Sequence, residues 1–193
     1  MMAILGEDRS DANTLKTIIR RLLNNDRATI KSKGFSGCGE LCRKAASVIR
    51  LFARQGASRF VICHDADGPD PQPVREKVHR KIVAPSGIKE SCCILVPVQE
   101  LEAWIIADVA AIQTVIPKFQ LKEIRHPENI KNPKEWLVQQ SRRNKSRPLY
   151  STTTYNESVA HYLDLDKVAQ KCPSFKPLIE FVRGCDQNRE ETR

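Results

Sequence analysis

Strand-like and helix-like segments alternate over the first 108 residues of the chain, and few folds accommodate that order. Apolar runs cover residues 3–5, 60–63 and 92–98, and residues 28–33 alternate between polar and apolar side chains. Between these segments apolar residues recur at helical spacing, first at Leu15, Ile18, Ile19, Leu22 and Leu23. Such alternation predicts an α/β, Rossmann-like fold: a mostly parallel sheet with helices on both faces.

The pattern weakens after residue 108. Helices are predicted at residues 133–140 and again within residues 156–182, with breaks at Pro148, Pro173 and Pro177. We therefore expect a core of residues 1–117, followed by a basic loop and a mainly helical extension, residues 118–193, packed on that core.

Several protein classes are excluded by what the sequence lacks. Its longest apolar runs are too short to span a bilayer, and its N-terminus has no secretory signal, so no membrane association is expected. The seven cysteines are an odd number at irregular spacing, which predicts reduced thiols and a cytoplasmic protein rather than a disulfide framework. The oligomeric state stays open, and a homo-oligomer is among the states that the sequence allows.

Basic residues are concentrated in one stretch. The chain has 32 Lys and Arg against 23 Asp and Glu, and residues 118–147 alone hold nine basic and three acidic residues. This excess predicts a polyanionic partner, above all nucleic acid, although a solvated charged surface is the alternative. The candidates for contacting phosphates are Arg142, Arg143, Lys145 and Arg147.

Acidic residues follow two of the predicted strands. Asp65 and Asp67 come just after the apolar run 60–63, two residues apart, so both are expected on one side of the strand. Glu7 and Asp8 stand in the equivalent place after the first strand, and Asp11 begins the first helix. If these strands are neighbours, the carboxylates meet at the carboxyl edge of the sheet, where α/β folds bind ligands.

Carboxylates packed together repel one another unless a proton or a cation intervenes. Oxygen ligands without His or Cys favour Mg²⁺ or Mn²⁺, whereas the simpler interpretation of Asp65 and Asp67 is a polar turn. His64 is expected to point to the opposite side, in a packed or hydrogen-bonded role. Glu100 and Glu102 follow the fourth strand, where they serve either as further metal ligands or only as favourable acids in a first helical turn.

These motifs resemble those of the Toprim superfamily, in its OLD-like nuclease branch. The segment EDRSD at residues 7–11 is similar to the acidic first motif, and FVICHDAD at residues 60–67 matches the second. The segment VQELEAWIIAD at residues 98–108 resembles a signature of small Toprim-like proteins encoded beside an ATPase in prokaryotic anti-phage modules. The resemblance covers about the first half of the chain.

The resemblance implies a Mg²⁺-dependent nuclease, the effector subunit of an ATPase-coupled defence system. By position, Glu7 would hold a metal ion or act as general base, Asp65 and Asp67 would hold metal, and Glu100 and Glu102 would supply a second site. Two features depart from the family pattern. Asp8 replaces the usual Gly, and no motif marks the late basic residue that such nucleases use to stabilise the transition state.

Two other functions remain open at this point. A non-catalytic nucleic-acid-binding or regulatory subunit would keep the fold without turnover, and the missing basic motif favours it. A phosphatase of the haloacid-dehalogenase type also uses an Asp-x-Asp-Gly segment after a buried strand, but on its first strand and with a following Thr, where this chain has Pro69.

Overall fold

Four parallel strands form one sheet in the computed structural model, which describes residues 1–88, 92–142 and 147–190. The strands are β1 (Met2–Gly6), β2 (Ile30–Gly34), β3 (Arg59–Cys63) and β4 (Cys92–Leu95), in the order β2-β1-β3-β4. The central strands β1 and β3 are apolar and buried on both faces, as parallel strands require, while the edge strand β2 alternates Lys with smaller residues.

The strand register aligns the ends from which the predicted site residues emerge. Leu5 pairs with Lys33 on one side and Ile62 on the other, and Cys63 pairs with Leu95. The backbone pairing continues past the strands, because the Ala66 N–H donates to Pro97 O at 3.0 Å. The loops after β1, β3 and β4 therefore leave the sheet at one edge.

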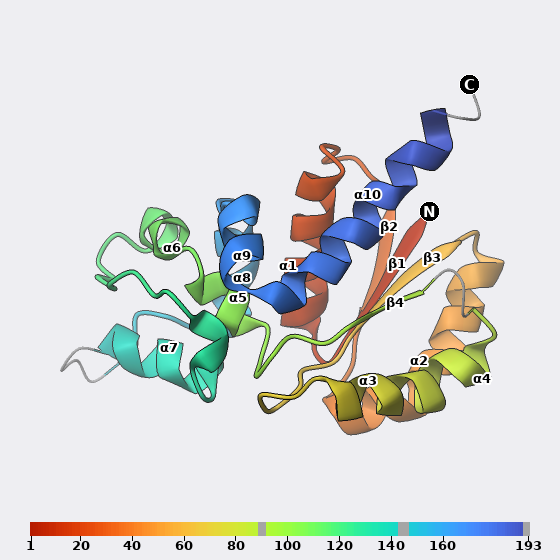
Figure 1. The fold of residues 1–193 in the computed structure, drawn as a ribbon, viewed down its shortest axis with the longest axis horizontal. Coiled ribbons are helices and arrows are strands. Elements are labelled where there is room, and N and C mark those ends of the chain that lie inside the picture. Colours follow the sequence, from red (N-terminus) through yellow and green to blue (C-terminus); the bar gives the residue numbers. More distant parts are fainter. Residues whose placement is uncertain (89–91, 143–146, 191–193) are drawn as a thin grey trace.

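Helices cover both faces of the sheet (Figure 1). One face carries α1 (Arg9–Leu22), and the other carries α2 (Cys38–Arg54) together with a second, irregular helix. That second helix runs from α3 (Gln72–Val78) through a π-helical turn, η1 (His79–Val83), into α4 (Ala84–Ser86). Strand residues alternate between the two cores, with Ile4 and Val61 on the α1 side and Leu5 and Ile62 on the α2 side.

The chain after β4 forms short helices and one longer one. The first two, α5 (Glu102–Ile106) and α6 (Val109–Val115), belong to the predicted core, residues 1–117. The C-terminal extension contains η3 (Pro127–Asn129), α7 (Pro133–Arg142), α8 (Thr152–Ala160), α9 (Leu165–Lys171), η4 (Pro173–Phe175) and α10 (Lys176–Glu190). Helix α8 packs on α1, and one hydrophobic core runs from Ile4 through Trp104 to Phe175 and Val182. The extension and the sheet therefore share a core.

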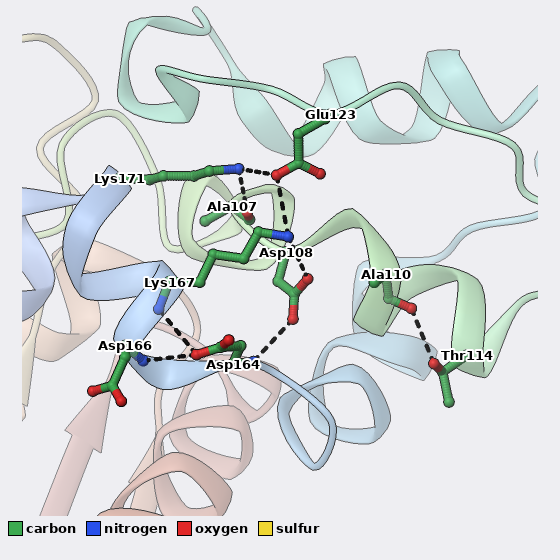
Figure 2. Close-up of polar contacts among 9 residues, drawn as sticks. All are labelled: Ala107, Asp108, Ala110, Thr114, Glu123, Asp164, Asp166, Lys167 and Lys171. Atoms are coloured by element: carbon green, nitrogen blue, oxygen red, sulfur yellow. Dashed lines mark hydrogen bonds and ion pairs between the residues drawn. The ribbon is translucent and has the colours of Figure 1, made fainter.

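A polar network fixes α9 to the turn between α5 and α6 (Figure 2). Asp108 accepts hydrogen bonds from the Asp164 backbone N–H at 2.9 Å and from Lys167 Nζ at 3.0 Å. Lys167 also pairs with Glu123 at 3.1 Å, and Lys171 bridges Glu123 and the Ala107 carbonyl. Asp108 thus has a structural role in this chain.

The structure confirms the predicted fold class, a mostly parallel α/β sheet with helices on both faces and a helical C-terminal extension. The fourth strand ends at Leu95 rather than Val98, because Pro97 cannot donate a ladder hydrogen bond. Of the helices in the described part of the chain, none is long and apolar enough to cross a membrane.

Candidate metal centre

The loops after β1 and β3 meet the start of α5 at the carboxyl edge of the sheet. The Asp65 backbone N–H donates to Glu7 Oε1 at 2.9 Å, which ties the two loops together. The Asp65 carboxylate in turn accepts a hydrogen bond from the Leu101 backbone N–H at 3.0 Å. Asp65 therefore lies between the first acidic loop and the acidic segment that precedes α5.

Glu7 is held by a buried histidine. His64 Nδ1 lies 2.8 Å from Glu7 Oε1, and His64 Nε2 lies 3.1 Å from Lys77 Nζ. A lysine ammonium has only donors, so Nε2 must accept and the imidazole proton belongs on Nδ1, facing Glu7. As predicted, His64 points to the opposite side of the strand from Asp65, since it contacts Lys77 of α3 whereas Asp65 contacts Leu101 of the α1-side core. Its hydrogen-bonded role is also as predicted, but the contact with Glu7 was not.

This arrangement keeps Glu7 ionised. Burial alone would raise the pKa of Glu7, but the His64 hydrogen bond, the Asp65 N–H and the charge of Lys77 together lower it below its ordinary value. A carboxylate with a lowered pKa is a poor proton acceptor near neutral pH and a good ligand for a cation. Of the two roles that the family resemblance implies for Glu7, these contacts favour the ligand.

The other acids of the centre have raised pKa values. Burial raises the pKa of Asp65 well above its ordinary range, and the charges of Asp11, Glu102, Glu7 and Glu100 raise it further. Burial, with the charges of Asp8 and Glu102, raises the pKa of Asp11 to about 8. Five of the predicted site residues therefore act on one another electrostatically: Glu7, Asp11, Asp65, Glu100 and Glu102.

Asp8 has a structural role at the start of α1. Its side chain accepts the Asp11 backbone N–H at 2.9 Å, and the Asp11 carboxylate accepts the Asp8 N–H at 3.3 Å, which makes a reciprocal capping box. The β2 residue Gly34 packs against this turn, where a Cβ atom would lie 2.4 Å from the Asp8 and Arg9 backbone. Asp8, where the family pattern has Gly, thus caps the helix and holds Asp11 in place.

Residues from the C-terminal extension position Glu102, which is buried. Asn156 Nδ2 donates to Glu102 Oε1 at 3.0 Å, and the Tyr150 hydroxyl donates to Asn156 Oδ1 at 2.7 Å. Burial raises the pKa of Glu102 despite the hydrogen bond from Asn156 and the charge of Lys134. No local pattern marks Asn156, since its hydrogen bond to Glu102 joins residues 54 positions apart.

Replacing Asn156 with Ala should destabilise the fold by about 2–4 kcal/mol, because both Glu102 and Tyr150 lose buried hydrogen-bond partners. Urea unfolding measures the loss. The matched control is Asn13→Ala, which removes an exposed 3.1 Å hydrogen bond to Glu157 of α8, the helix that also carries Asn156. That control should cost below about 1 kcal/mol. Equal losses in the two variants would contradict the role given to Asn156.

A lysine from the extension faces the acids. Lys134, in the first turn of α7, donates its backbone N–H to Glu100 Oε2 at 2.8 Å, and its Nζ lies 4.0 Å from Asp8 Oδ2. Burial would lower the pKa of Lys134, but the charges of Glu102, Asp8, Asp11 and Glu100 raise it above its ordinary value. No sequence motif marks this residue, which lies 34 positions after Glu100 and reaches it only through the fold.

Comparison with known proteins assigns the chain to a family. The model of a family described as a domain of unknown function, DUF4276, matches residues 6–183. The chain belongs to the DUF4276 family. No curated protein and no solved structure matches it.

The Asp67 carboxylate does not lie beside that of Asp65, although the sequence predicts both on one side of the strand. Strand β3 of this DUF4276 chain ends at Cys63, and Asp67 adopts a left-handed backbone conformation with φ +50°. Its N–H donates to Gln99 O at 2.9 Å, and its side chain is exposed. Asp67 therefore lies in a turn at the rim of the centre, whereas Asp65 lies within it.

The predicted phosphate contacts of the DUF4276 chain are only partly described. Arg142 ends α7 and Arg147 follows it, and both are exposed. Arg143 and Lys145 lie outside the described residues. Within residues 1–88, 92–142 and 147–190, no three His, Cys, Asp or Glu side chains are grouped closely enough to hold a metal ion as they stand.

Proposed function

We propose that this chain is a metal-dependent nuclease that hydrolyses phosphodiester bonds. The observation that carries the proposal is the group of carboxylates around Asp65, faced by Lys134, at the carboxyl edge of a parallel sheet. A bound cation would neutralise carboxylates that repel one another, and a lysine beside them can pair with the negative charge of a phosphate. The motif resemblance to OLD-like Toprim nucleases agrees with this chemistry.

The donor set fits Mg²⁺ or Mn²⁺. Every candidate ligand is a carboxylate oxygen, and the raised pKa values of Asp65 and Asp11 reflect burial and repulsion that a bound cation would relieve. Glu7, Asp11 and Asp65 would hold the ion, with Glu100, Glu102 and Asp67 as further ligands. The bound ion would polarise the scissile phosphate and supply hydroxide from water.

In this proposal other residues of the chain orient the acids, stabilise charge on the phosphate and contact flanking phosphates. His64 and Lys77 keep Glu7 ionised and oriented toward Asp65. Asn156 fixes the Glu102 carboxylate, and the backbone N–H of Leu101 fixes that of Asp65. Lys134 takes the place of the late basic residue, with its ammonium available to the charge that develops on the phosphate. The exposed Arg142 and Arg147, with Arg143 and Lys145, contact flanking phosphates.

Replacing Lys134 with Met should lower kcat by about a hundredfold, the usual effect of removing one group that stabilises transition-state charge. The matched control is Lys131→Met, three residues earlier and exposed, which should leave kcat within about twofold of the wild type because Lys131 is not among the charges that shift the pKa values of Asp11, Asp65 and Glu102. Steady-state cleavage assays of both variants make the comparison. An unchanged kcat for the Lys134 variant would remove this residue from the mechanism.

The cellular setting is part of the same proposal. The likeness of residues 98–108 to proteins encoded beside an ATPase supports a role as the effector subunit of an ATPase-coupled anti-phage system. The six free cysteines among the described residues suit a cytoplasmic location. Co-purification of the chain with the product of a neighbouring ATPase gene would test the partner, and cleavage that needs no partner would argue against coupling.

The direct test is cleavage of plasmid DNA and of bulk tRNA by the purified chain with Mg²⁺, Mn²⁺ or EDTA. Metal-dependent cleavage of either polymer is the expected result. Binding that persists in EDTA, with no cleavage in any metal even beside the ATPase, would instead establish a non-catalytic binding subunit. An aspartyl-phosphate trapped on Asp65 would establish a phosphatase.

A further inference from the structure

A second strongly basic surface lies on the opposite face of the sheet from the C-terminal extension. Helix α2 and the irregular helix from α3 to α4 pack against each other there, and they form a layer on the far side from α1 and α10 (Figure 1). Residues 38–54 and 72–88 together hold eight Lys and Arg against two Asp and Glu. These two segments therefore have the same excess of basic over acidic residues as residues 118–147.

Three of the four basic residues of α2 lie on one stripe. Arg43, Ser47, Arg50 and Arg54 follow the helical spacing i, i+4, i+7 and i+11, and all four are exposed. At 1.5 Å per residue the stripe is about 16 Å long, a length over which a nucleic-acid duplex carries about ten phosphate charges. The Arg50 guanidinium donates to Ser47 Oγ at 3.1 Å, which holds it along the stripe.

A second basic row lies beside the first. Arg80 and Lys81 are exposed and belong to the π-helical turn η1, which contacts α2. π-Helical turns are rare and are found often at functional sites. Arg50 also donates to the Pro85 carbonyl at 2.8 Å, which ties the two helices together. Between them lies a hollow of about 280 Å³, lined by Arg50, Ala53, Arg54, Ser86 and Ile88.

Both helices pass beside the candidate metal centre, since the N–H of Gly37, the residue before α2, donates to the Glu7 carbonyl at 3.0 Å. Lys77, one turn before Lys81, contacts His64, which in turn contacts Glu7. The basic residues of α1 differ, because the Arg20 and Arg21 guanidinium groups donate to the Ala28 and Ala160 carbonyls and the extension packs on that helix. The open basic rows of the chain thus lead from the acids outward along α2 and η1.

We propose that the face formed by Arg43, Arg50, Arg54, Arg80 and Lys81, here called the α2–η1 face, binds the sugar-phosphate backbone of a nucleic-acid duplex. The inference rests on the proposed nuclease function and extends it, since it assigns where the duplex lies beyond the scissile bond. Contacts to phosphates position a duplex without reading its sequence, so this face binds without sequence preference. The metal centre then cuts where the duplex passes the edge of the sheet.

Binding measured without metal tests this inference apart from catalysis. Labelled duplex DNA, duplex RNA and their single strands are titrated with the chain in EDTA over a series of KCl concentrations, and fluorescence anisotropy gives Kd. The variant Arg54→Glu/Arg80→Glu should bind the preferred duplex roughly tenfold or more weakly, because two phosphate contacts become repulsions. The slope of log Kd against log salt should fall by about two.

The matched control is Arg27→Glu/Arg183→Glu, which makes the same change in net charge at exposed residues outside the α2–η1 face. Its Kd should stay within about threefold of the wild type, with a nearly unchanged salt slope. Equal weakening of the two variants, no weakening of the first, or no duplex binding by the wild type would each overturn the inference. Circular dichroism confirms that both variants fold.

The same experiment separates this inference from the proposed function. A chain that binds duplex through the α2–η1 face but cleaves nothing with Mg²⁺ or Mn²⁺ would contradict only the nuclease proposal. A chain that cleaves, but whose affinity for duplex is unchanged by the Arg54→Glu/Arg80→Glu substitutions, would contradict only the assignment of duplex binding to the α2–η1 face.

Discussion

Cleavage by the Asp65→Asn variant should fall by about a thousandfold or more relative to the wild type. Asp65 lies at the middle of the carboxylate group, where the charges of Asp11, Glu102, Glu7 and Glu100 all act on it. An amide at this position supplies one neutral oxygen in place of a negative ligand. A loss of several kcal/mol in transition-state stabilisation corresponds to that factor in rate. Single-turnover cleavage at saturating Mg²⁺ measures it.

The same substitution should leave the metal-free fold intact or make it more stable. In the wild type the Leu101 N–H lies 3.0 Å from Asp65 Oδ1, and the Asn side-chain oxygen can accept the same hydrogen bond. The Asn side chain carries no charge, so the neighbouring carboxylates do not repel it. The melting temperature in EDTA should therefore equal or exceed that of the wild type, and Mg²⁺ should no longer raise it. Loss of cleavage together with a lower melting temperature would indicate a structural rather than a chemical role.

Asp70→Asn is the matched control for this experiment. Asp70 is an exposed aspartate five residues later in the same loop, and its Oδ1 accepts the Gln72 N–H at 2.9 Å, which Asn can also do. Its variant should cleave within about twofold of the wild type, because it lies outside the carboxylate group. A comparable loss in both variants would mean that the loop conformation, not the Asp65 carboxylate, controls cleavage.

Stability of the metal-free chain should fall by several kcal/mol as pH rises from about 4 to about 8. Burial, with the charges of Asp8 and Glu102, raises the pKa of Asp11 from its ordinary 3.8 to about 8. Between these values the folded state holds a proton that the unfolded state has released, so stability declines with pH through this window and levels off above it. Urea unfolding in EDTA at a series of pH values measures the decline.

Magnesium and the Asp11→Asn variant provide the controls for the pH prediction. Mg²⁺ replaces the proton as the compensating charge, so its stabilising effect should be larger at pH 8 than at pH 5. The Asn variant has no proton to lose, and its stability should vary less with pH than that of the wild type. A wild type whose metal-free stability is constant or rises over this window would contradict the arrangement of buried acids described here.

Much of the fold could be predicted because its local signals agree with its packing. The apolar run at β3 and the helical spacing of Leu15, Ile18 and Ile19 in α1 are properties of neighbouring residues, and burial confirms them. The π-helical turn was not predictable in the same way. It adds one residue to a turn within a helix whose periodicity, from Val74 through Val78 to Ile82, reads as regular.

The acidic half of the centre was also predictable, since Glu7, Asp11 and Asp65 each follow a strand whose end is fixed by the topology. The groups that control those acids come from distant segments. Lys134 and Asn156 reach Glu100 and Glu102 only because the extension folds back over the sheet edge. The turn that places Asp67 at φ +50° depends on pairing with Gln99, which no local pattern encodes.

The shared core of sheet and extension also determines when the centre can assemble during synthesis. The chain emerges from the ribosome with Glu7 first, then Asp65, and only much later the residues that hold Glu102 in place. Asn156 itself sits on a helix that is buried together with Phe175 and Val182. A nascent chain that has not yet reached these residues therefore carries the acids but not their supporting contacts, and the centre becomes complete only after the residues up to Val182 have been synthesised.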